Sequence, residues 1–408
     1  MPQYVELNPP ESKETESDTS SLTRWPVWAT GFRPFFFGGA VMAALSIAAW
    51  LIVFFGGLGA GGPAGPIDWH AHEMIFGFTP AIIAGFLLTA VPKWTGVETP
   101  TGGGLIALFG LWVAGRLAMA GAGLVPYLLV AIVDLLFLPA LAVAIAIPIG
   151  RSWTARNLGF IPLLFGLAAA NTLFHLDVLG LVDGLASTGL DAGLGIIIVI
   201  IAVVGGRVIP FFTSSALGVD TGGRRRLVDI VALGMSVAWL VALIIDPTAM
   251  ATGALALAAG AANLGRMWGW KTPKVFSIPL LWVLHVGYAF VGIGLLLFGL
   301  DVFDVTGTRS IAVHALTTGA IGILCLGMMA RVSLGHTGRP LKAHRWTAVA
   351  FVAIAAAAIV RVFVPWLVPG GYEAAVVGSG ILWTGAWILF LVVYAKILVR
   401  PRADGRPG

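Results

Sequence analysis

Apolar runs long enough to cross a lipid bilayer recur along almost the whole sequence of this chain. The hydrocarbon core of a bilayer is about 30 Å thick, and a helix of about 20 apolar residues spans it. Only 11% of the 408 residues are charged, against about 25% in soluble proteins, so a soluble enzyme is excluded. We therefore expect an all-α polytopic membrane protein with a single transmembrane domain over residues 24–400.

Twelve apolar segments follow from the breaks at glycine, proline and charged clusters. They cover residues 33–55, 72–93, 103–121, 123–148, 156–176, 186–210, 227–245, 248–267, 277–299, 309–332, 346–366 and 374–399, with boundaries good to about 2–4 residues. Residues 1–23 are polar, acidic and rich in Ser and Thr, which predicts a disordered cytoplasmic tail. Residues 401–408 are expected to form a second, short cytoplasmic tail.

The positively charged residues point to one orientation in the membrane. All Lys and Arg residues except Arg116, Arg309 and Arg361 fall in the tails or at the loops that follow even-numbered segments. Short loops rich in Lys and Arg stay on the cytoplasmic side of a membrane. We therefore expect both termini to be cytoplasmic.

A threefold internal repeat of four helices is predicted from matched positions in the second, sixth and tenth segments. These segments superpose without gaps on His72, Leu190 and His314, then on Gly77, Gly195 and Gly319, and then on Thr95, Thr213 and Thr337. The alternative is a chance match in a glycine-rich sequence. If the repeat is real, the two histidines occupy one equivalent site in the first and third units.

Histidines within the membrane are the strongest candidates for chemistry, because a buried ionisable side chain is costly and marks function by default. Neutral imidazole is a good ligand for haem iron and for copper. His72 and His314 share a depth and a repeat position, so we expect them to clamp one haem. His70 and His285 are further candidate cofactor and metal ligands, and His175 is a further candidate cofactor ligand. The alternative for each is a core histidine that is hydrogen-bonded to its neighbours.

His70 and His72 are two residues apart, which places them about 200° apart around a regular helix. They cannot both serve one centre unless His70 precedes the helix. Glu73 could orient an imidazole by accepting its second N–H, or it could be an acidic residue favoured at a helix start.

Four other charged residues stand out because they lie within apolar segments. Arg116, Arg309 and Arg361 fall near outer helix ends, where they could pair with haem propionates or extend to lipid headgroups. Asp134 lies near mid-bilayer in the fourth segment, where it could belong to a proton relay or hydrogen-bond within the bundle.

Five motifs together resemble those of the NnrS family. They are Gly31-Phe-Arg-Pro-Phe-Phe, Trp69-His-Ala-His-Glu-Met, Ala84-Gly-Phe-Leu-Leu-Thr-Ala-Val-Pro-Lys-Trp-Thr-Gly, Gly206-Arg-Val-Ile-Pro-Phe-Phe-Thr and Arg331-Val-Ser-Leu-Gly-His-Thr-Gly-Arg-Pro. The resemblance implies a bacterial inner-membrane protein of twelve helices that contains haem, which we expect to be haem b, with copper as a second candidate cofactor. It also implies a role in nitric oxide metabolism or in resistance to nitrosative stress.

A more distant similarity is to the catalytic subunit of haem-copper oxidases and nitric oxide reductases, whose low-spin haem ligands lie on helices 2 and 10. His72 and His314 match that placement. Helices 6 and 7 of those enzymes carry copper-site histidines, and here both corresponding segments lack His. A second metal site would have to be built elsewhere, from His70, His175 or His285.

Three functions stay open at this point. The first is a haem protein that handles nitric oxide as its partner. The second is a quinol-linked oxidoreductase resembling nitric oxide reductase, with Asp134 on a proton path. The third is a small-molecule transporter without haem. The residues leave open whether the chain is an enzyme. Membrane lipid is an expected partner and nucleic acid is not.

Overall fold

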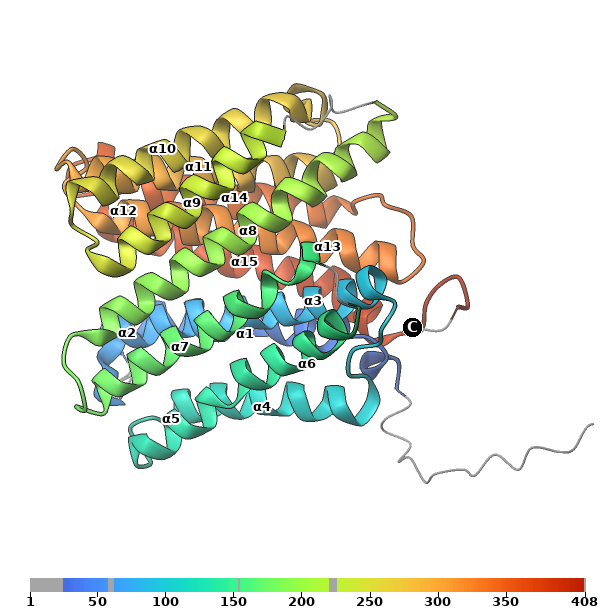
Figure 1. The fold of residues 1–408 in the computed structure, drawn as a ribbon, viewed down its shortest axis with the longest axis horizontal. Coiled ribbons are helices and arrows are strands. Elements are labelled where there is room, and N and C mark those ends of the chain that lie inside the picture. Colours follow the sequence, from blue (N-terminus) through green and yellow to red (C-terminus); the bar gives the residue numbers. More distant parts are fainter. Residues whose placement is uncertain (1–24, 58–61, 153–154, 220–225, 407–408) are drawn as a thin grey trace, which may run out of the picture.

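The computed structural model describes residues 25–57, 62–152, 155–219 and 226–406, and these residues form helices and no strand. The predicted tail over residues 1–23 lies outside the described residues. The helices run side by side along the long axis of the molecule (Figure 1). They are α1 (Phe32–Phe54), α2 (Gly65–His72), α3 (Thr79–Thr95), α4 (Gly102–Ala120), α5 (Tyr127–Leu135), α6 (Phe137–Ser152), α7 (Phe160–Val178), α8 (Leu185–Leu217), α9 (Arg226–Ile245), α10 (Met250–Arg266), α11 (Pro279–Val302), α12 (Arg309–His314), α13 (Ile323–His336), α14 (Arg345–Leu367) and α15 (Tyr372–Val399).

The prediction of an all-α polytopic membrane protein is confirmed. Among the described residues, 11 helical spans are long and apolar enough to cross a membrane. The remaining predicted segment, 248–267, corresponds to α10, a helix of 17 residues. The chain is therefore a multi-pass membrane protein.

Two segments differ from the sequence prediction at their starts. The second segment was expected to begin at His72, but its helix begins at Gly65, so that His70 and His72 both lie within α2. The fourth segment was expected to begin at residue 123, but α5 begins at Tyr127, directly after Pro126. The helix of the fourth segment is also interrupted at Leu136, two residues after Asp134, so that it forms α5 and α6.

Four spans form the centre of the bundle. At least two thirds of the positions are buried in the most apolar stretches of Gly62–Thr95, Leu185–Leu217, Pro279–Val302 and Arg309–His336, against fewer than half in each of the other seven spans. Small residues allow these central helices to approach closely. A Cβ at Gly294 of α11, for example, would lie 3.0 Å from the backbone nitrogen of Leu316 in the span Arg309–His336.

The two central spans that carry His72 and His314 share a rare backbone feature. Each changes from α-helix to π-helix at the residue after its histidine, over Glu73–Phe78 in one span and Ala315–Gly322 in the other. In contrast, α8 has Leu190 at the matched position and runs as an uninterrupted α-helix. π-Helical turns are rare and frequently mark functional sites. This pattern agrees with the matched positions of the repeat, although the repeat itself stays a prediction.

The two ends of the bundle differ in composition. The helices α3, α6, α8, α10 and α13 all end at the end of the bundle where the C-terminus lies, whereas α2, α5 and α12 lie at the opposite end (Figure 1). Most basic residues in the described part of the chain lie at or just after the C-terminal ends of these five helices. Two hydrogen bonds hold the C-terminal segment against the basic end of the bundle. Arg402 donates to the His336 backbone oxygen at 2.8 Å, and the Ala403 amide donates to the Thr337 backbone oxygen at 2.9 Å.

Candidate metal centre

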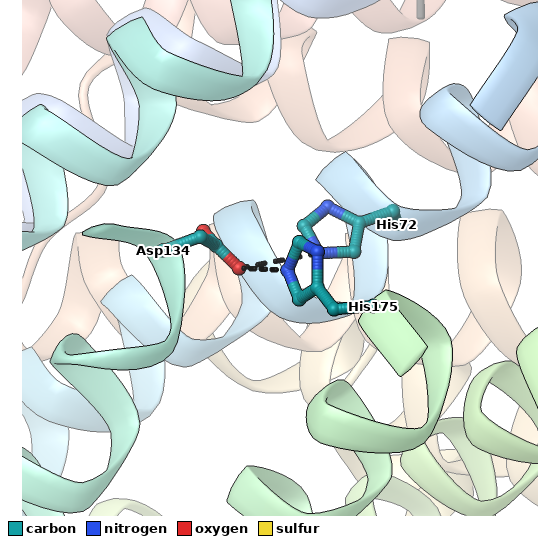
Figure 2. Close-up of side chains that lie close together, drawn as sticks. All are labelled: His72, Asp134 and His175. Carbon is teal, nitrogen blue, oxygen red and sulfur yellow. Dashed lines mark hydrogen bonds and ion pairs between the residues drawn. The ribbon is translucent and has the colours of Figure 1, made fainter. Parts of the chain in front are cut away.

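Three side chains from three helices meet at the end of the bundle opposite the C-terminus. They are His72 of α2, Asp134 of α5 and His175 of α7, and both imidazoles face the Asp134 carboxylate (Figure 2). Asp134 Oδ2 lies 3.0 Å from His175 Nε2 and 3.3 Å from His72 Nε2. One ligand atom from each residue lies within 4.8 Å of the others, and all three residues are buried. This cluster could therefore hold a metal ion.

The outer ring nitrogen of each imidazole has its own oxygen partner. His72 Nδ1 lies 3.1 Å from Glu73 Oε1, and His175 Nδ1 lies 3.0 Å from the Tyr127 hydroxyl. Metal-bound histidines usually donate their second N–H to a carboxylate or another oxygen, which fixes the ring and the tautomer. The contacts of both rings fit that arrangement, with the two Nε2 atoms facing the centre of the cluster.

Arg116 and Asn171 hold the carboxylates in place. The Arg116 guanidinium bridges Glu73 Oε1 and Asp134 Oδ1. Asn171 donates from Nδ2 to Asp134 Oδ2 at 2.8 Å, and its Oδ1 lies 2.9 Å from His72 Nε2. One oxygen of Asp134 is thus held by the guanidinium, while the other faces both imidazoles.

The charges of the cluster favour one additional cation. With neutral imidazoles, the two carboxylates of Glu73 and Asp134 outweigh the single charge of Arg116. An uncompensated charge is costly in the interior of a membrane protein. A proton on His72 would compensate it, because both of its ring nitrogens face acceptor oxygens. A metal ion between the Nε2 atoms and Asp134 would compensate it equally well.

The local sequence explains how Arg116 reaches this position. The π-helix that follows His72 places Glu73 beside the imidazole and brings Gly77 opposite α4. A Cβ on Gly77 would collide with the Arg116 guanidinium. The Trp112 indole, one turn earlier on α4, donates to the Gly77 backbone oxygen at 2.9 Å. Only a residue without a side chain leaves room for the guanidinium here.

His314 has different surroundings from His72. Its Nδ1 lies 2.7 Å from the Ser310 backbone oxygen, and the Ser310 hydroxyl is 3.4 Å from Arg361 Nη2. His70 faces away from the cluster, and its ring stacks on Trp50 at 4.5 Å between centroids. The structure thus brings His72 together with His175 and Asp134, and the haem shared by His72 and His314 stays a prediction.

The other predicted residues have protein partners. Both ring nitrogens of His285 lie 2.9 Å from threonine hydroxyls, those of Thr213 and Thr272. These contacts agree with the hydrogen-bonded alternative for this histidine. Arg309 pairs with Asp191 at 2.9 Å and lies over the Phe298 ring.

The sequence made Asp134 a candidate for a proton relay or for a hydrogen bond within the bundle, and His175 a candidate cofactor ligand. It did not place either residue with His72. It did not identify Tyr127 or Asn171. One signal was available, because Asn171 and His175 are four residues apart and therefore share a face of α7. Two polar side chains on one face of a mostly apolar helix indicate a polar partner across that face.

Comparison with known proteins identifies the family of the chain. Residues 26–402 match the family described as NnrS protein, which is nearly the whole chain. No curated protein matches the sequence. The chain belongs to the NnrS family.

Proposed function

We propose that this NnrS-family membrane protein acts in nitric oxide metabolism and in resistance to nitrosative stress, through a metal centre at His72, Asp134 and His175. The observation that carries the proposal is the buried set of two imidazoles and one carboxylate, in which each imidazole has its outer nitrogen fixed by a second oxygen. Haem b and copper are the proposed cofactors of the protein, and an ion in the cluster belongs to the transition metals that imidazole binds.

A bound transition metal would supply a coordination position for a small diatomic ligand. The protein side chains have separate tasks. Glu73 and Tyr127 orient the two imidazoles, Asn171 holds the oxygen of Asp134 that faces them, and Arg116 offsets the negative charge of the carboxylates. Nitric oxide is a small apolar gas that partitions into lipid, so a site among membrane-spanning helices is accessible to it.

The proposed location is the bacterial inner membrane, with both termini in the cytoplasm. Support comes from the basic residues, which gather at the end of the bundle where the C-terminus lies (Figure 1), together with the preference of basic loops for the cytoplasmic side. The cluster would then lie toward the periplasmic side of the membrane.

The test combines metal analysis with a growth assay. Purified wild type and His175→Ala are compared for bound transition metal, and His285→Ala serves as the control because its imidazole has two hydroxyl partners of its own. We expect wild type and the control to retain metal that His175→Ala loses. Equal metal in all three proteins, or none in wild type, would overturn the assignment of the centre.

In cells, deletion of the gene is expected to increase sensitivity to nitric oxide donors more than sensitivity to peroxide. Complementation with wild type or His285→Ala should restore growth, whereas His175→Ala should not. Equal growth of the deletion strain and the parent under nitric oxide, with the protein shown to be expressed in the parent, would refute the proposed role.

A second candidate function is a quinol-linked oxidoreductase resembling nitric oxide reductase. The observation that favours it is the chain of hydrogen-bonding groups around Asp134, which links Tyr127, His175, His72 and Glu73 and could hold a proton inside the membrane. Consumption of nitric oxide by the purified protein with a reduced quinol, and its loss in Asp134→Asn, would support this candidate. Normal nitric oxide resistance without such turnover would exclude it. A protein without haem or metal would instead fit the transporter.

A further inference from the structure

A second group of ligand-type side chains lies on the other side of α2 from the metal cluster. It contains His70, His314 and Arg361, which come from α2, α12 and α14. His70 and His72 project from α2 in different directions because they are two residues apart. The contacts agree, since His72 belongs to the metal cluster whereas His70 stacks on Trp50 of α1 at 4.5 Å, with 16° between the ring planes.

A continuous series of contacts joins His70 to His314. The ring centroids of Trp50 and Phe54 are 6.1 Å apart, and those of Phe54 and Tyr372 of α15 are 6.4 Å apart. Arg361 lies over the Tyr372 ring at 5.3 Å, and its Nη2 is 3.4 Å from the Ser310 hydroxyl. His314 completes the series by contacting Ser310. The series places both histidines at the same end of the bundle, where α2 and α12 lie (Figure 1).

Both imidazoles have free ligand atoms, unlike those of His72 and His285. Within the described part of the chain, no hydrogen bond or ion pair engages either ring nitrogen of His70 or Nε2 of His314. The ring of His314 is fixed through Nδ1, which lies 2.7 Å from the Ser310 backbone oxygen, as expected for an imidazole whose Nε2 binds a metal. Both side chains are also partly accessible, although they lie between membrane-spanning helices.

Arg361 gives the site a charge that suits a ligand with carboxylates. It is buried, and within the described part of the chain it contacts the Ser310 hydroxyl and the Tyr372 ring rather than an acidic side chain. Among the three arginines at this end, Arg116 and Arg309 are paired with protein carboxylates. A buried guanidinium without a carboxylate is a ready partner for a carboxylate on a ligand.

We propose that His70 and His314 are the two axial ligands of a haem, and that Arg361 pairs with one of its propionates. The inference rests on the proposed function insofar as the protein binds haem, but it names a site separate from the His72, Asp134 and His175 cluster. It also replaces His72 with His70 as the partner of His314. The aromatic side chains of Trp50, Phe54 and Tyr372 would flank the ligand.

The experiment measures haem and non-haem metal separately in wild type and in His70→Ala, His314→Ala and His72→Ala. We expect the first two variants to lose the low-spin absorption and electron paramagnetic resonance signals of bis-imidazole haem, while His72→Ala retains them. Non-haem metal should behave in the opposite way, being lost only in His72→Ala. Arg361→Met should retain haem with a changed reduction potential, because the potential responds to nearby charge.

Chemical rescue separates ligation from folding. His314→Gly leaves space for free imidazole, so added imidazole should restore the low-spin signal in His314→Gly and in the matched variant His70→Gly. A normal haem spectrum in His70→Ala, or loss of haem in His72→Ala but not in His70→Ala, would overturn the inference. Wild-type protein that neither contains haem nor takes up added haemin would also overturn it, and the non-haem metal content would still test the proposed function.

Discussion

Replacement of Arg116 by methionine should destabilise the protein far more than the loss of an exposed charge would. The guanidinium bridges two buried carboxylates, those of Glu73 and Asp134, which are 5% and 1% exposed. Removing one partner of a buried ion pair costs about 3–5 kcal/mol, since the remaining charge is left uncompensated. That cost corresponds to roughly two to three and a half powers of ten in the unfolding equilibrium constant.

A second variant tests whether charge is the cause. Arg116→Met combined with Glu73→Gln has the same summed charge as wild type, with Asp134 as the remaining carboxylate. Contacting residues in one network typically show coupling energies of about 0.5–3 kcal/mol, so the double variant should lose less stability than the two single variants together. The free energy of unfolding is measured by denaturant titration in bicelles, with a chelator present because bound metal would add its own stabilisation.

The matched control is Arg309→Met, whose ion pair with Asp191 is partly accessible, with 31% and 21% of the side chains exposed. Exposed pairs contribute about 0–1 kcal/mol, so this variant should change the free energy of unfolding much less. The reasoning would be refuted if Arg116→Met cost no more than Arg309→Met, or if the losses from Arg116→Met and Glu73→Gln were simply additive.

The remaining predictions concern packing and topology. Gly77→Ala should push the Arg116 guanidinium away from its carboxylates and cost about 1–3 kcal/mol of unfolding free energy, as overpacking does. Gly110→Ala on α4 is its control, because a Cβ there meets open space, and equal losses in both variants would contradict the packing argument. Reporter fusions at the N-terminus, in the loop between α8 and α9 and at the C-terminus should all report the cytoplasm. A periplasmic signal at any of the three positions would contradict the twelve-helix topology.

The membrane-spanning helices could be predicted because a bilayer imposes one dominant requirement on sequence. Every span must be apolar over about 20 residues, and that pattern can be recognised in the sequence without knowing any tertiary contact. The separation of His70 from His72 also followed from sequence, since residues two positions apart lie on different sides of an α-helix. The structure places them in two different groups of side chains.

The depth of Asp134 was harder to predict because composition does not show where an apolar run becomes helical. The fourth segment was expected to begin at residue 123, but α5 begins at Tyr127. Four residues correspond to about 6 Å along a helix, so Asp134 lies closer to the end of the bundle than mid-bilayer. It therefore reaches the level of His72 and His175.

The metal cluster itself could not be derived from sequence because its members come from three helices. The proximity of the three side chains depends on how α2, α5 and α7 pack, and no local sequence motif indicates that packing. The π-helices after His72 and His314 are similar in this respect. They depend on how side chains pack around the wider turn.

The most direct test of the metal centre is X-ray absorption at the edge of the non-haem metal in purified wild type, His175→Ala and His285→Ala. We expect a transition metal with imidazole scattering in wild type, at metal–nitrogen distances of about 2.0–2.1 Å if the ion resembles zinc. The His285→Ala spectrum should match wild type, whereas His175→Ala should lose the metal or one imidazole from its coordination. Wild-type protein without non-haem metal, or a His175→Ala spectrum identical to that of wild type, would contradict the account.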